Sequence, residues 1–280
     1  MEVIQSPDEV RNHARQQRAG GLTVGVVPTM GALHAGHASL IEAARERCDY
    51  VIATIFVNPT QFGPNEDFER YPRTLDDDLK KCAEAGADLV FTPETSHMYR
   101  PDAECDVRVK GLTQKLEGRL RPGHFDGVTT VVAKLFNITV PDVAFFGQKD
   151  FQQQLVIRRM VLDLDWGIEI VTCPIIREPD GLAMSSRNRY LSAEEREQAL
   201  VLYQSLVRAA EQSGHASPQQ IATELRQQIG AQSGVELDYA VVVDEETLEP
   251  ATDDADTAVA LVAARLGKTR LIDNLRLRFR

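Results

Sequence analysis

Residues 24–37 constrain the fold of this chain more than any other stretch. They read Val-Gly-Val-Val-Pro-Thr-Met-Gly-Ala-Leu-His-Ala-Gly-His. The β-branched beginning is typical of a buried strand, residues 28–31 carry a proline and a glycine for a turn, and the apolar spacing of residues 40–47 predicts a helix. A strand, a glycine-bearing turn and a helix present backbone N–H groups and a positive helix end to a phosphate.

Two histidines, His34 and His37, stand at the predicted helix entrance. Their spacing of three places both on one face of the first helical turn. An imidazole that can be cationic near neutral pH is a suitable phosphate ligand and transition-state stabiliser. The alternative is an ordinary strand–helix corner with surface histidines, and the glycine spacing is not that of the dinucleotide G-x-G-x-x-G pattern. The histidine pair favours a phosphate site.

The composition limits the classes of partner. The chain has 280 residues, of which 43% are apolar, so we expect one large or two modest domains with a real core. A net charge of −11 argues against nucleic acid as the main partner, because phosphate binding needs a basic surface. No apolar run approaches membrane-spanning length, and residues 1–18 lack the apolar segment of a secretory signal. The four cysteines have no C-x-x-C spacing, so we expect a reduced cytoplasmic protein without a zinc site or a disulfide framework.

The order of apolar segments predicts the fold class. Predicted strands alternate with helices in the first two thirds of the chain, with strands over residues 50–57, 88–91, 143–146 and 168–173 and helices over 75–85, 128–137 and 151–162. This alternation favours an α/β fold with a Rossmann-like, doubly wound parallel sheet. A short added strand is also predicted over residues 107–110. Near the start of the chain, Ser6, Pro7 and Glu9 predict a helix with Ser6 as N-cap, Pro7 at N1 and Glu9 at N3.

The end of the chain has a different pattern. Helices over residues 192–213, with a Ser192/Glu195 capping box, and over 218–230 precede strands over 235–243 and 259–266. We therefore expect a Rossmann-like nucleotide- and substrate-binding domain over residues 1–176 and a smaller α+β domain over 177–280 that acts as a lid.

Further polar loops follow predicted strands, where open α/β sheets bind ligands. Asn58 and Gln61 carry amides that can orient a small polyhydroxy substrate, although their loop can also be a plain connection stiffened by prolines. Arg121 lies in a loop rich in Gly, Arg and His and suits a carboxylate or phosphate, although the loop can simply lead to a helix cap at Asp126. Lys149, at another helix entrance, is unfavourable there unless an anion binds, and Asp150 can accept from ribose hydroxyls.

Three successive aspartates, Asp76 to Asp78, admit a magnesium site. We favour helix capping instead, with Thr74 as the N-cap and Asp77 completing a capping box. Lys81, one turn further on, is unsuited to a metal site. We therefore expect no metal held by the protein and Mg²⁺ bound to nucleotide phosphates. Whether Asp77 or Asp78 holds a metal stays open at this point.

Several motifs resemble those of one family. His34-Ala35-Gly36-His37 resembles the H-x-G-H signature of the nucleotidyl-transferring α/β superfamily, and Met-Ser-Ser-Arg at 184–187 resembles its K-M-S-K-S-type phosphate loop. The longer strings at residues 28–37, 56–63 and 121–128 resemble the pantothenate synthetase family. The motifs occur in order over residues 24–190, and the resemblance is weak after residue 190.

The resemblance implies ATP-dependent ligation of pantoate and β-alanine through a pantoyl adenylate, by a homodimer that needs no covalent intermediate. It implies catalytic roles for four residues, His34, His37, Lys149 and Arg187, with His37 as proton donor. The implied ATP site comprises Met30, Gly31, His34, Gly36, His37, Gly147, Gln148, Lys149, Asp150, Ile176, Met184, Ser185, Ser186 and Arg187. Gln61 and Gln153 would bind pantoate, with Asn58 and Arg121 as further candidates.

Two other functions remain open on the sequence. One is a nucleotidylyltransferase that transfers AMP or CMP to a phosphate rather than to a carboxylate. The other is a catalytically silent nucleotide-binding or regulatory protein, against which the paired histidines and the phosphate loop count. A tRNA-charging enzyme is disfavoured because no basic RNA-binding domain is visible.

Overall fold

The computed structural model describes residues 1–64 and 66–279, and the chain divides into two compact units. The first unit comprises residues 1–148 and 152–174, and the second comprises residues 149–151 and 175–280. The sequence placed the boundary between residues 176 and 177. It did not anticipate that residues 149–151 group with the C-terminal part of the chain.

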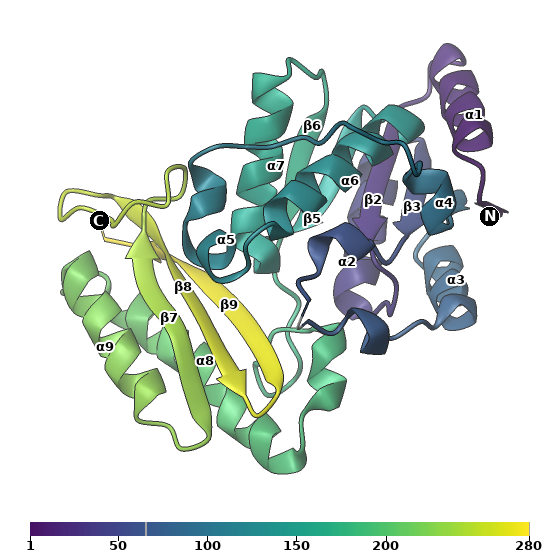
Figure 1. The fold of residues 1–280 in the computed structure, drawn as a ribbon. Helices are drawn as coiled ribbons and strands as arrows, with labels where there is room; N and C mark the ends of the chain where they lie inside the picture. Colours follow the sequence, from purple (N-terminus) through teal and green to yellow (C-terminus); the bar gives the residue numbers. More distant parts are fainter. Residues whose placement is uncertain (65, 280) are drawn as a thin grey trace. The chain divides into compact units, whose positions relative to one another are not determined.

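In the described part of the first unit, six strands form one sheet, in which every pairing is parallel. The strands are β1 (Glu2–Ile4), β2 (Val24–Thr29), β3 (Tyr50–Ile55), β4 (Leu89–Phe91), β5 (Val143–Gly147) and β6 (Glu169–Cys173). Their order is β1-β4-β3-β2-β5-β6 (Figure 1). This confirms the doubly wound Rossmann-like sheet, to which the unpredicted β1 adds one edge. The direction of winding reverses between the neighbours β2 and β5, which is where such folds bind ligands.

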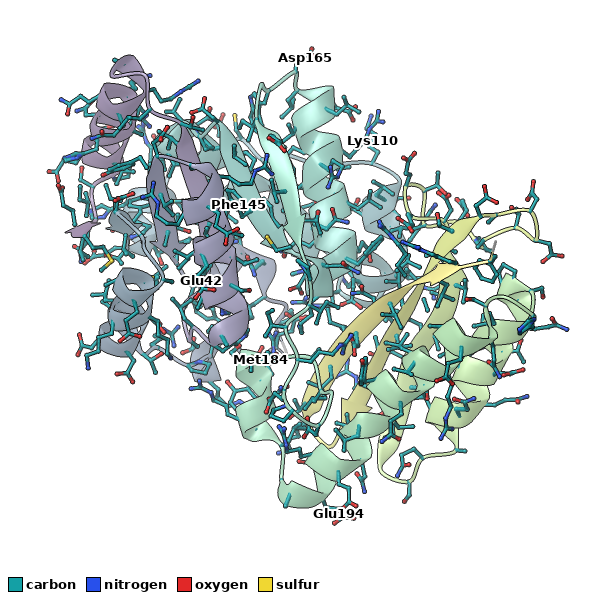
Figure 2. All side chains as sticks on the ribbon, turned by 180° about the vertical axis from the view of Figure 1, so that it is seen from behind. Glu42, Lys110, Phe145, Asp165, Met184 and Glu194 are labelled. Carbon is teal, nitrogen blue, oxygen red and sulfur yellow. The ribbon has the colours of Figure 1, made fainter. Side chains whose placement is uncertain are left out.

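The helices of this unit cover both faces of the sheet. They are α1 (Pro7–Ala19), α2 (Ala35–Arg47), α3 (Leu75–Glu84), α4 (Thr95–Met98), α5 (Leu116–Leu120), α6 (His124–Thr139) and α7 (Phe151–Asp163). In β5, Ala144 and Phe146 belong to the core that α1, α6 and α7 share, while Val143 and Phe145 belong to the core with α2 and α3. Phe145 is labelled on the sheet in Figure 2. Burial on both faces explains why these strands are apolar throughout.

Local sequence signals predict some helix starts correctly and others incorrectly. α1 begins as predicted, because Pro7 is its first residue and the Ser6 hydroxyl accepts from the Glu9 N–H at 3.4 Å. The helix predicted over residues 128–137 begins earlier, because α6 starts at His124 after Gly123, whose φ is +82°, so the alternative of a cap at Asp126 is wrong. The predicted strand over residues 107–110 is also absent from the described structure. The Val107 N–H donates to Thr130 Oγ1 at 3.0 Å, so α6 side chains take the place of a strand partner.

In the second unit, helices α8 (Ala193–Gln212) and α9 (Pro218–Gly230) share one core with an antiparallel sheet. Its strands β7 (Val235–Val243), β8 (Thr257–Leu266) and β9 (Thr269–Arg278) lie in that order. Both helices, β7 and β8 are predicted, including the Ser192/Glu195 capping box of α8. The sequence missed β9, which carries the adjacent polar residues Asp273 and Asn274, types that are depleted in strands. Among the described residues, no helix has the length and apolar character needed to cross a bilayer.

Candidate active site

The two histidines cap the helix that follows β2. His34 is the N-cap of α2, and its Nδ1 accepts from the Gly36 N–H at 3.1 Å. His37 Nδ1 accepts from the His34 N–H at 3.4 Å, and the two ring centroids lie 4.1 Å apart. Because both Nδ1 atoms accept, each neutral ring carries its proton on Nε2. Both imidazoles therefore lie at the N-terminus of α2, the position that the sequence predicts.

Helix α3 holds the turn between β2 and α2. Gly31 and Ala32 have φ angles of +81° and +51°, so both residues adopt the left-handed backbone conformation. The Asp78 carboxylate accepts from the N–H groups of Ala32 and Leu33 at 2.8 and 2.7 Å, and Lys81 Nζ donates to the Leu33 carbonyl at 2.7 Å. The acidic and basic residues of α3 thus fix the backbone ahead of His34.

This arrangement corrects the predicted capping box. Thr74 is the N-cap of α3, but its side chain makes no capping bond and instead donates to Asp78 Oδ1 at 3.2 Å. Asp77 is exposed and lies 3.7 Å from Lys80. Among the described residues there is no group of three or more His, Cys, Asp or Glu side chains that could hold a metal ion. Asp78 therefore binds the backbone of the turn and Thr74, and the capping box with Asp77 does not form.

A buried amide network adjoins the same turn. The Asn58 amide, 1% exposed, donates to Gln61 Oε1 and to the Gly127 carbonyl, both at 3.2 Å. Asn58 Oδ1 accepts from the Tyr99 hydroxyl at 2.7 Å. Gln61 Nε2 lies 2.9 Å from Met30 Sδ. The structure thus brings together the predicted residues Met30, Asn58 and Gln61, with Asn58 orienting the Gln61 amide.

Helix α6 approaches this network closely. A Cβ atom at Gly127 would collide with the Thr60 carbonyl, so glycine is required for the contact between α6 and the 3₁₀ turn Pro59–Gln61. The sequence could not identify Tyr99 as a partner of Asn58, because the two are 41 residues apart and Tyr99 lies in no motif.

Behind Gln61 lies an ionic cluster. Arg121 binds Glu66 through Nε and a terminal nitrogen, each at 2.6 Å. His124 Nδ1 lies 2.8 Å from the Gln61 carbonyl, and its Nε2 lies 3.0 Å from Arg121. Burial, with the Arg121 charge, lowers the pKa of His124 to about 4, so the ring is neutral at pH 7. Its Nδ1 then donates to Gln61, while Nε2 accepts from Arg121.

The same cluster determines the surroundings of Arg121. Burial raises the pKa of Glu66, but the hydrogen bond and charge of Arg121 outweigh it and hold that pKa below its ordinary value. Glu66 is therefore ionised. It binds the guanidinium of Arg121, which the sequence analysis named as a candidate for binding a substrate carboxylate or phosphate. The cluster connects Arg121 to the backbone of Gln61 through His124.

Beyond β5, residues 147–150 lead into α7 as a 3₁₀ turn, Gln148–Asp150, and the helix continues with three glutamines. Gln152 is buried and binds the Glu117 N–H and two carbonyls, and Gln154 binds Thr172. Gln153 is half-buried, and its amide makes no hydrogen bond to the described residues. Gln152 and Gln154 thus use their amides in hydrogen bonds within the described structure, and Gln153 is the one of the three that does not.

Residues 176–187 form a hairpin in the second unit, which we call the 176–187 hairpin. The Met184 N–H donates to the Ile176 carbonyl at 3.0 Å, and Arg177 pairs with Ala183 as an antiparallel bridge. Ser185 caps the 3₁₀ helix Ser186–Tyr190 by accepting from the Arg187 N–H at 3.2 Å. The hairpin therefore groups the predicted residues Ile176, Met184, Ser185, Ser186 and Arg187.

Comparison with known proteins identifies the family. A family model described as pantoate-β-alanine ligase matches residues 2–276. The chain is 50% identical to the pantothenate synthetase of Thermotoga petrophila, over 98% of this chain and 99% of that one. It is 48% identical to the enzyme of Acetivibrio thermocellus, with the same coverage.

Solved structures agree. The pantothenate synthetase of Thermus thermophilus is similar with a TM-score of 0.93 and 45% identity, over 98% of this chain and 99% of that chain. The pantoate-β-alanine ligase of Francisella tularensis, complexed with β-γ ATP and β-alanine, has a TM-score of 0.80 and 34% identity, with 98% and 97% coverage. The chain therefore belongs to the pantoate–β-alanine ligase family and is an ATP-dependent ligase that forms pantothenate from pantoate and β-alanine.

Proposed function

We propose that the ligation proceeds in two half-reactions through a pantoyl adenylate. The pantoate carboxylate attacks the α-phosphorus of ATP, and pyrophosphate leaves with the electrons of the broken P–O bond. The β-alanine amine then attacks the acyl carbon, loses a proton, and AMP leaves. The helix-capping histidine pair carries this proposal, because it supplies imidazole donors where a phosphoryl oxygen would develop charge.

In this proposal His34 and His37 stabilise the first transition state through their Nε2 atoms, and His37 is the proton donor. The rings are preorganised by the reciprocal capping bonds, so little reorganisation is needed when charge develops. Met30, Gly31 and Gly36 complete the corner that accepts the nucleotide. The turn ahead of the histidines is held by Asp78 and Lys81, which supports a rigid site.

Further donors to ATP come from Lys149 and the 176–187 hairpin. Lys149 and Arg187 supply positive charge for the phosphates, and Ser185 and Ser186 supply hydroxyls. Gly147, Gln148, Asp150, Ile176 and Met184 complete this ATP-binding set, with Asp150 accepting from ribose. Mg²⁺ enters bound to the ATP phosphates in this proposal, because this small hard cation is commonly bound through substrate phosphates.

Pantoate binds through two amides, Gln61 and Gln153. The Gln61 side chain is held by Asn58 and its backbone by His124, which supports a fixed orientation. An amide both donates and accepts, so it can pair with the hydroxyls and the carboxylate of pantoate. In this proposal Asn58 and Arg121 act on pantoate through Gln61. We also infer a cytoplasmic homodimer in which residues 177–280 act as a lid, on the family resemblance.

Pyrophosphate exchange tests the order of the half-reactions. Pantoate alone should support exchange of labelled pyrophosphate into ATP, and β-alanine should be needed only for net AMP release. His37→Ala should slow exchange by about 10²- to 10³-fold, as for one lost preorganised donor. His97→Ala, an exposed histidine of the same unit, is the matched control and should exchange normally. Exchange that strictly requires β-alanine would contradict the adenylate.

A further inference from the structure

Two adjacent polar residues are buried in β9, where apolar side chains would avoid a desolvation cost. Asp273 is 4% exposed and Asn274 is fully buried. A buried carboxylate or amide is destabilising unless it is hydrogen-bonded, so its partners indicate what it holds in place. Replacement of a buried ion pair by apolar residues is often neutral or stabilising. Fold stability by itself is therefore not a sufficient explanation for a carboxylate at Asp273 and an amide at Asn274.

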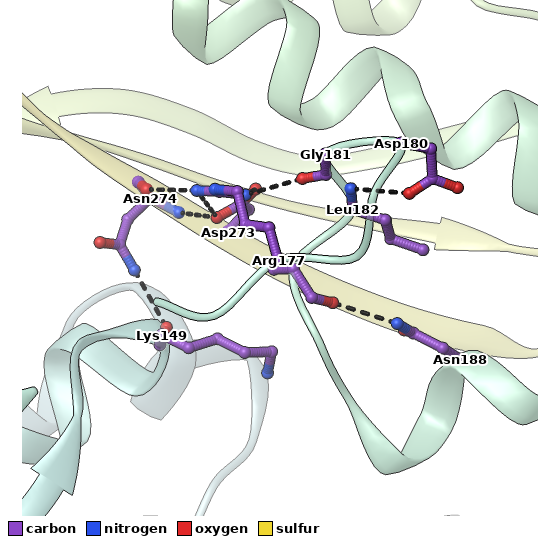
Figure 3. Close-up of polar contacts among 9 residues, drawn as sticks. Lys149, Arg177, Asp180, Gly181, Leu182, Asn188, Asp273 and Asn274 are labelled. Carbon is purple, nitrogen blue, oxygen red and sulfur yellow. Dashed lines mark hydrogen bonds and ion pairs between the residues drawn. The ribbon is translucent and has the colours of Figure 1, made fainter. Parts of the chain in front are cut away.

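Asp273 holds the 176–187 hairpin through Arg177. The two side chains form a two-point ion pair with distances of 2.6 and 3.0 Å (Figure 3). Arg177 also donates to the Gly181 carbonyl at 3.1 Å, and its guanidinium stacks 3.9 Å from the Tyr203 ring centroid. One guanidinium thus connects β9 and α8 to the turn of the hairpin that carries Met184 to Arg187.

Asn274 binds the backbone of Lys149, the second segment that carries a positive charge proposed to bind ATP. Its Nδ2 donates to the Lys149 carbonyl at 3.0 Å, across 125 residues of sequence (Figure 3). The Asn274 N–H in turn donates to Asp273 Oδ1 at 2.7 Å, so the two polar residues are themselves joined. Lys149 belongs to the same compact unit as β9, although it follows a strand of the parallel sheet.

We infer that Asp273 and Asn274 are positioning residues for ATP binding. Asn274 fixes the backbone from which the Lys149 side chain extends, and Asp273 fixes the 176–187 hairpin through Arg177. This inference rests on the proposed role of Lys149 in ATP binding. It makes β9 part of the nucleotide-binding machinery, although neither residue contacts the nucleotide.

A double-mutant cycle tests the inference. ATP affinity is measured by calorimetry without pantoate for the wild type, Asn274→Ala, Lys149→Ala and the double variant. Asn274→Ala should weaken ATP binding by about 3- to 10-fold, the range of one or two lost hydrogen bonds. In the Lys149→Ala background the same change should have little further effect, because Asn274 acts through Lys149. Arg276→Ala, on the same strand with an exposed side chain, should bind ATP normally.

The outcomes separate this inference from the proposed role of Lys149. If Lys149→Ala binds ATP normally, the role of Lys149 fails, and the inference is overturned with it. If Lys149→Ala weakens binding but Asn274→Ala does not, or if their effects multiply in the double variant, only the inference is overturned.

A second readout excludes a general structural defect. In pyrophosphate exchange, Asn274→Ala should raise the KM for ATP and leave the KM for pantoate unchanged, whereas a damaged fold would change both. Should Asn274→Ala fail to fold, Arg177→Lys replaces it, since it keeps the charge but loses the two-point pair with Asp273. Arg177→Lys should weaken ATP binding in the same range, with little further effect in an Arg187→Ala background. Unchanged ATP affinity in a folded Arg177→Lys variant would contradict the inference.

Discussion

At the scale of single residues, His124 makes the stability depend on pH. Its pKa falls from an ordinary 6.5 to about 4 in the folded chain, first because of burial and then because of the Arg121 charge. The folded state therefore binds this proton less tightly than the unfolded state. The stabilisation is full above about pH 6.5 and is lost as the pH falls toward about 4, by at most about 3 kcal/mol.

We predict that His124→Asn removes this part of the pH dependence. The asparagine amide can still donate to the Gln61 carbonyl but does not titrate. Urea unfolding at about pH 7 and about pH 5 should give a smaller loss of unfolding free energy for the variant than for the wild type. Equal losses for the two proteins would mean that His124 is not neutral in the folded chain.

Gln61 is predicted to set selectivity for the pantoate hydroxyls. A site whose polar groups pair with substrate hydroxyls can reject analogues lacking them by as much as roughly 10⁴-fold. Deoxy-pantoate should thus be a poor substrate in pyrophosphate exchange. Gln61→Ala should reduce the difference in exchange rate between pantoate and deoxy-pantoate. Asn58→Ala should act in the same direction, because Asn58 orients the Gln61 amide. Indifference to the hydroxyls in both wild type and variants would contradict this.

At the scale of elements, α3 acts on the histidine corner through Asp78. Asp78→Ala removes the acceptor of two buried N–H groups, so the free energy of unfolding should fall by about 2–4 kcal/mol, and exchange should slow. Asp77→Ala, exposed on the same helix, should change stability by less than about 0.5 kcal/mol. Raising the Mg²⁺ concentration should not restore exchange to Asp78→Ala, whereas recovery would indicate a metal role.

At the scale of the whole molecule, three of the four cysteines are enclosed by the fold. Cys48, Cys82 and Cys173 are buried, and Cys105 is exposed. Burial raises the pKa of each buried thiol, to about 12 for Cys82, so these thiols are unreactive. A thiol reagent should modify Cys105 alone in the folded protein and leave ligation intact. Rapid labelling of a buried thiol, or inactivation on Cys105 modification, would contradict this arrangement.

The sequence by itself determined the features that depend on neighbouring residues or on a short period. Apolar runs on both sheet faces predicted the parallel doubly wound sheet, and Ser6-Pro7 and the Ser192/Glu195 box predicted two helix starts. The histidine pair was placed correctly at the entrance of α2 because three residues of spacing suffice to define one helical face. Family resemblance then supplied the substrates, which periodicity alone does not specify.

The tertiary structure decided which residues distant in sequence hold the individual candidate site residues in place. Asp78 reaches the backbone of Ala32 across 46 residues, His124 reaches Gln61 across 63, and Asn274 reaches Lys149 across 125. Such contacts have no sequence period, since each depends on where the chain returns after several intervening elements. β9 was missed for the same reason: Asp273 and Asn274 are unfavourable in a strand, and their bonds to Arg177 and Lys149 form only after folding brings these residues near.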